Sequence, residues 1–280
     1  MKMMAEIRIW GEFPTEYLKY IIDNFHVKDG YNRSLDKDIC YGAKFEVEFE
    51  SQQYCEITNY LSMKKVKYEI YKGAKFTPKE LDSIPYFIMI DEAVDGDPRG
   101  FDYNYSEVCS YCHFGRALKS RLQISPSKLK KNRLTFVGIL MQQNPIIIIP
   151  TEYIDLFKEC SGITFEPVLN PRTKEELWQF VQLKISNILN KANAKTNFVS
   201  NEEEGCSHCN IPRVTLYDNL YYDQRTLDAA FDFNMSYEWY GGGPFPPRRI
   251  IVSQKVRQIV LKNKLLCKGC FKPILSVPPF

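Results

Sequence analysis

The sequence predicts an α+β protein with a small N-terminal unit followed by a duplicated C-terminal domain that a metal ion holds together. Three observations lead to this prediction. Strand and helix patterns alternate in residues 1–92, two Cys-x-x-Cys motifs lie far apart in the chain, and the same order of parts follows each motif. The 280 residues are 44% hydrophobic and 25% charged, which is typical of a globular protein with a substantial core.

Residues 1–92 are expected to form a small α/β sandwich, and a ferredoxin-like arrangement is one candidate for it. Two helices are expected, one that starts at Pro14 and one over 51–63. The segment Thr77-Pro78-Lys79-Glu80 has the capping-box pattern of a third helix start. Apolar and polar residues alternate, as in half-buried strands, over 7–10, 44–49 and 66–71. The acidic, Gly/Pro-containing segment 91–100 is expected to mark the domain boundary.

Residues 101–280 contain an internal repeat, with halves at about 101–170 and 200–280. Each half is expected to contain a Cys-x-x-Cys knuckle, an apolar strand, a helix and a Cys-containing turn into a Phe-x-Pro-apolar end. The two strands are Ile146–Ile149 and Ile250–Ser253, and Ser253 is the expected N-cap of the second helix. Duplicated halves tend to pack about a pseudo-twofold axis, so we expect the two knuckles to meet.

A further helix is expected between the two halves. The segment Thr173-Lys174-Glu175-Glu176 matches a capping box. The apolar residues that follow are spaced as on one helix face; they are Leu177, Phe180, Val181, Ile185, Ile188 and Leu189.

The two knuckles predict one structural zinc ion. A Cys-x-x-Cys turn presents two sulfurs to one tetrahedral ion, and two such turns complete a Cys₄ site. The four predicted ligands are Cys109, Cys112, Cys206 and Cys209. A compact zinc ribbon separates its knuckles by about 15–20 residues, whereas here 113–205 lies between them, which the repeat explains. Two pairs of thiols that match by chance, or a redox dithiol, are the alternatives, and His113 and His208 could serve as substitute ligands.

A third Cys-x-x-Cys, Cys267 and Cys270, has only Cys160 as its counterpart in the first half. We interpret these as structural thiols. No known catalytic motif is present, because three histidines cannot form a His-Glu-x-x-His helix and the chain has no P-loop, dinucleotide-binding or nucleophile-elbow sequence. The expected class is therefore not an enzyme.

Positive charge gathers in two stretches, although the net charge is only +3. These stretches, 116–133 and 248–272, contain no Asp or Glu. They permit two interpretations: binding of a protein partner through an electrostatically complementary surface, or nucleic-acid binding beside a zinc-ribbon-like module. The pI of 8.2 is modest for a phosphate-binding domain, which favours the protein partner. The candidate partner-binding residues are Arg116, Lys119, Arg121, Lys130, Lys131, Arg133, Arg248 and Arg249.

The first residues lack the apolar core of a secretory leader, and the run Ile146–Ile149 is too short to span a bilayer. A cytoplasmic protein with no membrane partner is expected.

The knuckles Cys109/Cys112 and Cys206/Cys209, with the ending from Ile250 through Gly269, Phe271 and Pro273, resemble the bacterial double-CXXCG motif family, best represented in myxobacteria. The resemblance covers roughly 101–280. It departs from the family pattern at His113 and Asn210, where the family has glycine. That family includes immunity proteins, so the resemblance implies a zinc-stabilised protein that neutralises a cognate toxin without catalysis.

Overall fold

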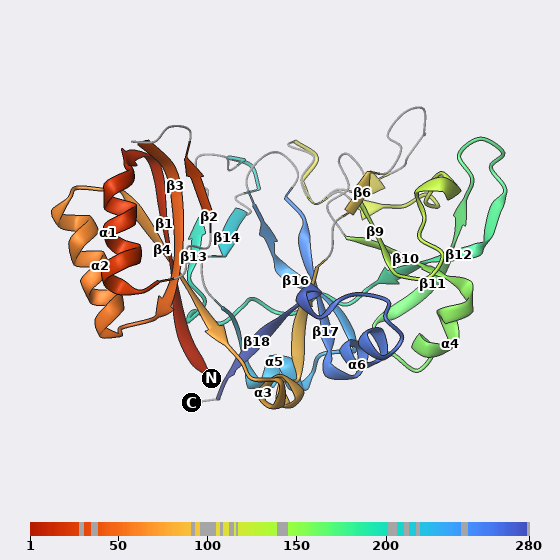
Figure 1. The fold of residues 1–280 in the computed structure, drawn as a ribbon. Helices are drawn as coiled ribbons and strands as arrows, with labels where there is room; N and C mark the ends of the chain where they lie inside the picture. Colours follow the sequence, from red (N-terminus) through yellow and green to blue (C-terminus); the bar gives the residue numbers. More distant parts are fainter. Residues whose placement is uncertain are drawn as a thin grey trace. The chain divides into compact units, whose positions relative to one another are not determined.

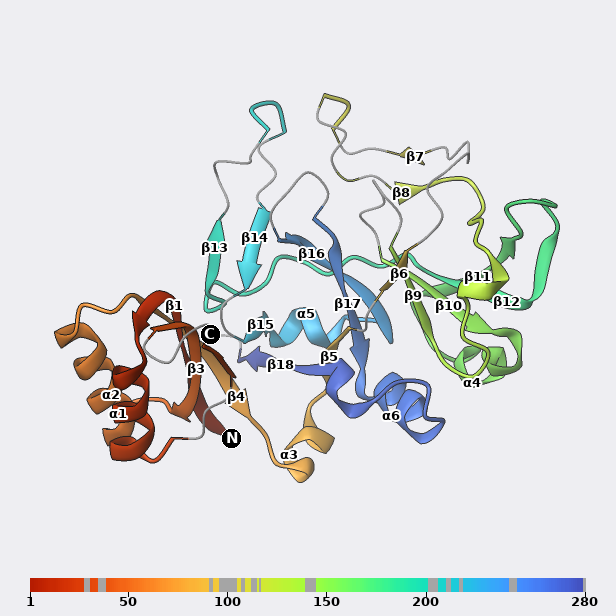
Figure 2. The same ribbon diagram turned by 45° about the horizontal axis from the view of Figure 1, so that its top comes forward.

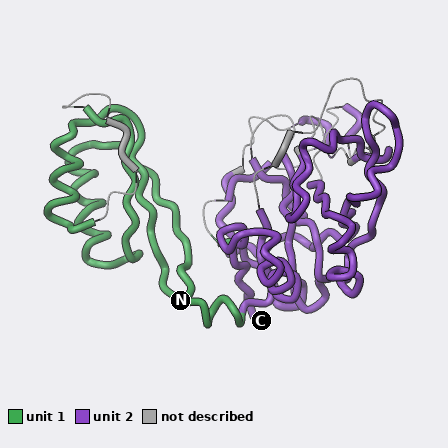
Figure 3. The backbone as a smooth tube through the Cα atoms, turned by 45° about the vertical axis from the view of Figure 1, so that its right-hand side comes forward, with its two compact units in different colours: residues 1–83, 217–219 green, residues 84–216, 220–280 purple. Residues whose placement is uncertain are grey.

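The computed structural model describes residues 1–27, 31–34, 39–90, 93–95, 105–106, 109–111, 115, 117–138, 145–200, 206–209, 213–216, 219–241 and 246–278. The chain forms two compact units (Figure 3). Unit 1 comprises Met1–Ser83 with Tyr217–Asn219, and unit 2 comprises Ile84–Leu216 with Leu220–Phe280. Helices and sheets are mixed along the chain, so the predicted α+β class is confirmed.

Unit 1 is a four-stranded antiparallel sheet with two helices against one face (Figure 1). Its elements are β1 (Lys2–Pro14), α1 (Thr15–Phe25), β2 (Tyr31–Ser34), β3 (Ile39–Glu48), α2 (Gln52–Met63), β4 (Tyr68–Lys75) and α3 (Pro78–Ser83). The sheet order β2-β3-β1-β4 and the chain order β-α-β-β-α-β are those of a ferredoxin-like unit.

The expected helix starts and strand faces produce this fold directly. Ile7 and Phe45 are buried on the inner face of the sheet, where Leu18 of α1 and Ile57 of α2 pack against them. The Ser51 hydroxyl accepts a hydrogen bond from the Tyr54 amide, which caps α2. The Thr77–Glu80 capping box also forms at the start of α3, since each side chain accepts from the other residue's amide.

Unit 2 contains two larger sheets and a short hairpin. The five-stranded sheet has the order β11-β12-β10-β9-β6, and the seven-stranded sheet has the order β13-β14-β16-β17-β5-β18-β15. The strands of the first are β6 (Ala93–Asp95), β9 (Thr135–Gly138), β10 (Ile146–Pro150), β11 (Ile163–Leu169) and β12 (Glu176–Ile185). Those of the second are β5 (Tyr86–Met89), β13 (Phe198–Ser200), β14 (Arg213–Leu216), β15 (Leu220–Asp223), β16 (Phe233–Tyr240), β17 (Arg248–Ser253) and β18 (Phe271–Val277). The hairpin is β7 (Tyr105–Ser106) with β8 (Ala117–Leu118).

The helices of unit 2 are short. They are α4 (Ile154–Phe157), α5 (Gln224–Asp228) and α6 (Gln254–Lys262), with 3₁₀ turns at Pro126–Lys128, Thr151–Tyr153 and Lys268–Cys270. Ser253 caps α6 as expected, because its hydroxyl accepts from the Val256 amide. Val256 and Val260 are fully buried on the inner stripe of this helix.

The division between the units falls earlier than the 91–100 boundary that the sequence suggests. Strand β5 belongs to unit 2 because it pairs antiparallel with both β17 and β18. A strand in the middle of a seven-stranded sheet cannot be separated from its partners, so the unit begins at Ile84.

The helix expected after Thr173 is wrong: the structure forms β12 there. Asn170 and Glu175 close a hairpin between β11 and β12, and Lys174 at its tip has a left-handed φ of 62°. The Thr173 hydroxyl accepts from the Glu175 amide two residues on, which is a turn contact and not a helix cap. Pairing with β10 and β11 outweighs the local helical pattern.

The two halves of the expected repeat share a strand–helix–strand order, β10-α4-β11 and β17-α6-β18. In each, a third strand lies between the two and runs antiparallel to both: β12 in the first, β5 in the second. The inserted strand follows β11 in the first half but precedes β17 in the second. The duplication itself stays a prediction.

Candidate metal centre

Both cysteine knuckles belong to connections between paired antiparallel strands. In the sequence, Cys109 lies between β7 and β8, and Cys206 and Cys209 lie between β13 and β14. Figure 2 shows the two strand pairs. A hairpin connection leaves its tip free of ladder pairing, so the tip backbone can turn two sulfurs toward one point.

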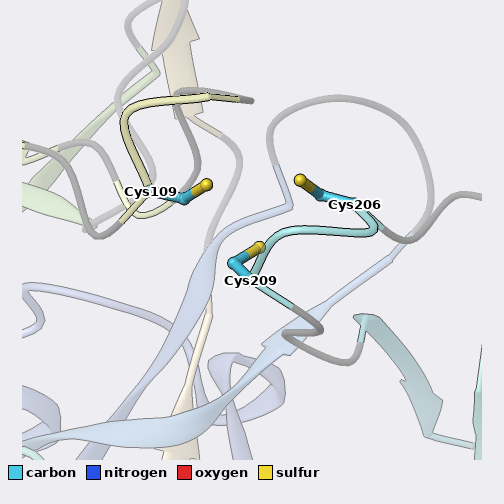
Figure 4. Close-up of side chains that lie close together, drawn as sticks. All are labelled: Cys109, Cys206 and Cys209. Carbon is cyan, nitrogen blue, oxygen red and sulfur yellow. The ribbon is translucent and has the colours of Figure 1, made fainter.

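Three of the four predicted ligands meet. The sulfurs of Cys109, Cys206 and Cys209 all lie within 4.8 Å of one another and point toward a common space (Figure 4). Tetrahedral zinc with Zn–S bonds of about 2.3 Å places its sulfurs about 3.8 Å apart, so a small contraction would seat an ion. Cys112 lies outside the described residues. The cluster can therefore hold a metal ion with three described thiol ligands.

An apolar floor supports the cluster. The Trp239 side chain is only 4% exposed and packs against Cys109, which is 8% exposed, and against the half-buried Cys206 and Cys209. The buried indole therefore gives the three sulfurs an apolar neighbour on one side.

Strand pairing brings Trp239 to this place. Strand β14 runs parallel to β16 with Arg213 opposite Trp239, and the Gly241 amide donates to the Val214 carbonyl at 2.9 Å. Strand β14 begins four residues after Cys209, so its pairing with β16 brings the second knuckle close to Trp239, against which Cys206 and Cys209 pack.

The residues inside the two knuckles also touch. The rings of Tyr111 and His208 lie 3.9 Å apart at a 35° tilt. The His208 amide donates to the Cys206 sulfur at 3.4 Å, a bond that stabilises a thiolate. The candidate ligand group within the described residues consists of sulfurs alone, so His208 belongs to the second knuckle but is not among the candidate ligands. His113 is outside the described residues.

The described basic residues of the predicted partner surface divide into two groups. Arg248 and Arg249 are half-buried, and their guanidinium groups stack on Trp239 and Tyr240 of their own unit. Burial lowers the pKa of both. In the other stretch, Lys119, Arg121 and Lys131 are exposed, whereas Lys130 and Arg133 are half-buried. Arg116 lies outside the described residues.

The exposed Trp178, which lies close to the exposed basic residue Lys131, was not predicted from the sequence. Trp178 of β12 is 78% exposed and lines two cavities, of about 520 Å³ and about 240 Å³. Lys131 and Glu152 line the larger one, and Arg121 forms an ion pair with the neighbouring Glu176. Strict alternation over 176–185 would place Trp178 on the same face as the buried Phe180 and Gln182, so no local pattern could have predicted that this tryptophan is exposed.

The remaining cysteines are separate from the cluster. Cys40 is buried in β3, Cys55 is exposed on α2, and Cys160 is buried near the end of α4. Burial, aided by the charge of Asp232, raises the pKa of Cys160 to about 11, so this thiol stays protonated. Cys267 and Cys270 lie next to each other between α6 and β18.

No family model matches this chain, and no curated protein or solved structure matches it. The resemblance to the double-CXXCG family therefore stays a prediction. None of the helices in the described part of the chain is long and apolar enough to cross a membrane.

Proposed function

We propose that this chain is a non-catalytic, zinc-stabilised binding protein that recognises another protein. The observation that carries the proposal is the meeting of Cys109, Cys206 and Cys209, which come from two separate strand connections. An all-sulfur donor set with an apolar floor suits a structural ion, and a tetrahedral sulfur site favours zinc among the common metals.

Zinc would act as a crosslink. Bound there, it supplies no reaction chemistry and holds the two connections together, which removes chain entropy from the unfolded state. Cys112 is the expected fourth ligand on the spacing of its knuckle. We place the protein in the cytoplasm, where thiols stay reduced and available to a metal.

Metal analysis tests this part of the proposal. Protein purified without chelator is expected to contain one zinc per chain, and Cys206→Ser is expected to lose both the zinc and several kcal/mol of stability. Cys55→Ser is the matched control, because Cys55 is an exposed cysteine on α2 of the other unit. A zinc-free wild type that unfolds at the same temperature as zinc-loaded protein, or iron in place of zinc, would overturn the assignment.

For the partner, the best-supported surface is that around Trp178. Large exposed aromatic side chains flanked by cavities are the usual anchors of protein interfaces, because burying them releases much apolar surface at a small entropic cost. The charges next to this anchor are mixed, because Lys131 and Arg121 lie there together with Glu152, Glu175 and Glu176. A surface with charges of both signs suits a partner that presents complementary charges of both signs.

The resemblance to immunity proteins makes a bacterial toxin the proposed partner. The first test expresses a toxin encoded by a neighbouring gene in cells, with and without this chain, and measures whether the chain restores growth. The second measures binding of the purified chain to the purified toxin by calorimetric titration. Trp178→Ala is expected to weaken binding by at least about 30-fold, the effect of a typical hot spot. Trp10→Ala, at an exposed tryptophan of unit 1, is expected to leave it unchanged. No rescue together with no binding would remove the proposal.

Single-stranded nucleic acid is the second candidate, because Lys131 lies beside an exposed tryptophan on which a base could stack. Titration of a fluorescent oligonucleotide at low and at physiological salt tests it. Tight, salt-dependent binding that Trp178→Ala abolishes would favour this candidate over a protein partner.

A further inference from the structure

The pair Cys267 and Cys270 constitutes a second thiol site, distinct in its place in the fold from the candidate metal centre. The two sulfurs are 3.1 Å apart, within a thiol hydrogen bond. We propose that this pair is a reversible oxidation site that a low-molecular-weight disulfide, such as oxidised glutathione, converts to an intramolecular disulfide.

The backbone around the pair is already arranged for closure. A disulfide brings two sulfurs to about 2.05 Å, so each thiol needs to move only by about half an ångström. The Cys270 amide donates to the Cys267 carbonyl at 3.1 Å, and the Ile90 amide donates to the Cys270 carbonyl at 2.8 Å. Cys270 also leads directly into β18, in the interior of the seven-stranded sheet. Buried Leu265 and Leu266 hold the chain on the other side of the pair.

The two thiols differ in access, which assigns their roles. Cys267 is exposed, whereas Cys270 is 6% exposed. Between them, Gly269 has no side chain to cover the attacking sulfur; a Cβ there would stand 3.9 Å from the Cys267 sulfur. An external disulfide can therefore reach Cys267 first, and Cys270 can act only as the resolving thiol.

The reaction balances in two exchanges. The Cys267 thiolate attacks one sulfur of the external disulfide, forms a mixed disulfide and releases one thiolate. Cys270 gives its proton to solvent and attacks the Cys267 sulfur, which releases the second thiolate. The chain loses two protons and two electrons, and the external disulfide takes up both and is reduced to two thiols.

Metal binding is the competing role for such a pair. Within the described residues, the one group of three or more ligand side chains close enough for a metal is that of Cys109, Cys206 and Cys209. The two sulfurs of Cys267 and Cys270 are 3.1 Å apart, closer than the about 3.8 Å between two sulfurs of one tetrahedral zinc, so their spacing suits oxidation better than shared coordination.

The test uses the full chain as purified, in a Cys55→Ser background so that the exposed thiol of α2 forms no adduct. After incubation with oxidised glutathione, intact mass spectrometry is expected to show a loss of about 2 Da, and peptide mapping is expected to place the crosslink at 267–270. Dithiothreitol is expected to restore the original mass.

Two variants separate the roles of the two thiols. Cys270→Ser is expected to stop at a stable glutathione adduct on Cys267, and Cys267→Ser is expected to form neither adduct nor crosslink at this site. A wild type that keeps the adduct on Cys267, that does not react there, or that holds a metal on this pair would overturn the proposal. Because the crosslink is mapped by peptide, the result does not depend on whether zinc occupies the other cysteines.

Discussion

The guanidinium carbon of Arg248 lies 4.0 Å from the centroid of the Trp239 ring, whose other contacts include the cysteine cluster. The same guanidinium donates to the Ser236 carbonyl and, at 2.6 Å, to the Tyr237 carbonyl. The register between β16 and β17 shifts between Met235 and Trp239, so the carbonyls within that bulge need a donor from outside the ladder. Arg248 thus connects an irregular strand to the floor of the candidate metal centre.

Replacing this arginine by lysine tests the connection. Arg248→Lys keeps the charge but loses the planar group that stacks on Trp239 and reaches two carbonyls, so we expect the free energy of unfolding to fall by about 1–3 kcal/mol. Urea denaturation measures it. Arg121→Lys, at an exposed arginine, is the control and should change little. Equal stability of the two variants would show that the stacked arrangement contributes nothing.

Tryptophan emission reports metal removal. Trp10 and Trp178 are exposed, while Trp239 is buried beside the sulfurs. If a chelator removes the ion and the two connections separate, Trp239 gains water contact and its emission should shift to longer wavelength. Trp239→Phe should abolish the shift, whereas Trp178→Phe should retain it. A shift that persists without Trp239 would place the conformational change elsewhere.

Gly162 occupies a position that no other residue fits. Its φ is +86°, and an added Cβ would stand 2.2 Å from the Phe233 carbonyl oxygen. Gly162→Ala combines a left-handed backbone with a clash against rigid main chain, so we expect a loss of about 3 kcal/mol or more. Gly73→Ala, where an added Cβ meets nothing within 4 Å, is the control and is expected to be near neutral. Calorimetric melting temperatures distinguish the two outcomes.

Asp232 links the turn after α4 to the start of α6. Its carboxylate accepts from the Ser161 amide at 3.0 Å and from the Ser253 hydroxyl at 2.7 Å. Burial alone would raise its pKa, but these hydrogen bonds and the nearby Lys255 outweigh burial and hold the pKa below its usual value. The stabilisation is therefore present above the unfolded-state pKa and is lost as the pH falls through the lower folded-state pKa.

Asp232→Asn should accordingly cost about 1–2 kcal/mol at neutral pH, and the difference from wild type should shrink as the pH falls below about 4. Both proteins are denatured in the presence of a chelator, so that loss of a metal at low pH does not contribute to the difference in their stability. Asp155→Asn, at a carboxylate that is 80% exposed, is the control and should show no such pH dependence. A cost that stays constant across the acid range would mean that shape, not charge, accounts for the effect.

Local patterns were sufficient for most of unit 1. The alternation around Phe45 and the capping box that begins at Thr77 act within a few positions of themselves, and each produced the element that it predicts. The same reasoning failed at Thr173. There, the chain forms a hairpin turn instead of a helix, because β11 and β12 pair with each other on either side of the turn.

The candidate metal centre shows the same division. The Cys-x-x-Cys spacing of Cys109 with Cys112, and of Cys206 with Cys209, was enough to predict two knuckles, because one turn can bring two sulfurs three residues apart to the same ion. The repeat had led us to expect that the knuckles meet, but only the tertiary structure decided that Trp239 packs against them and that Trp178 is exposed. The place of Trp239 follows from the register of β14 on β16, and Trp178 lies where β12 has passed its last pair with β10 and its pairing with β11 is irregular. Such long-range strand pairing is not encoded by any local spacing.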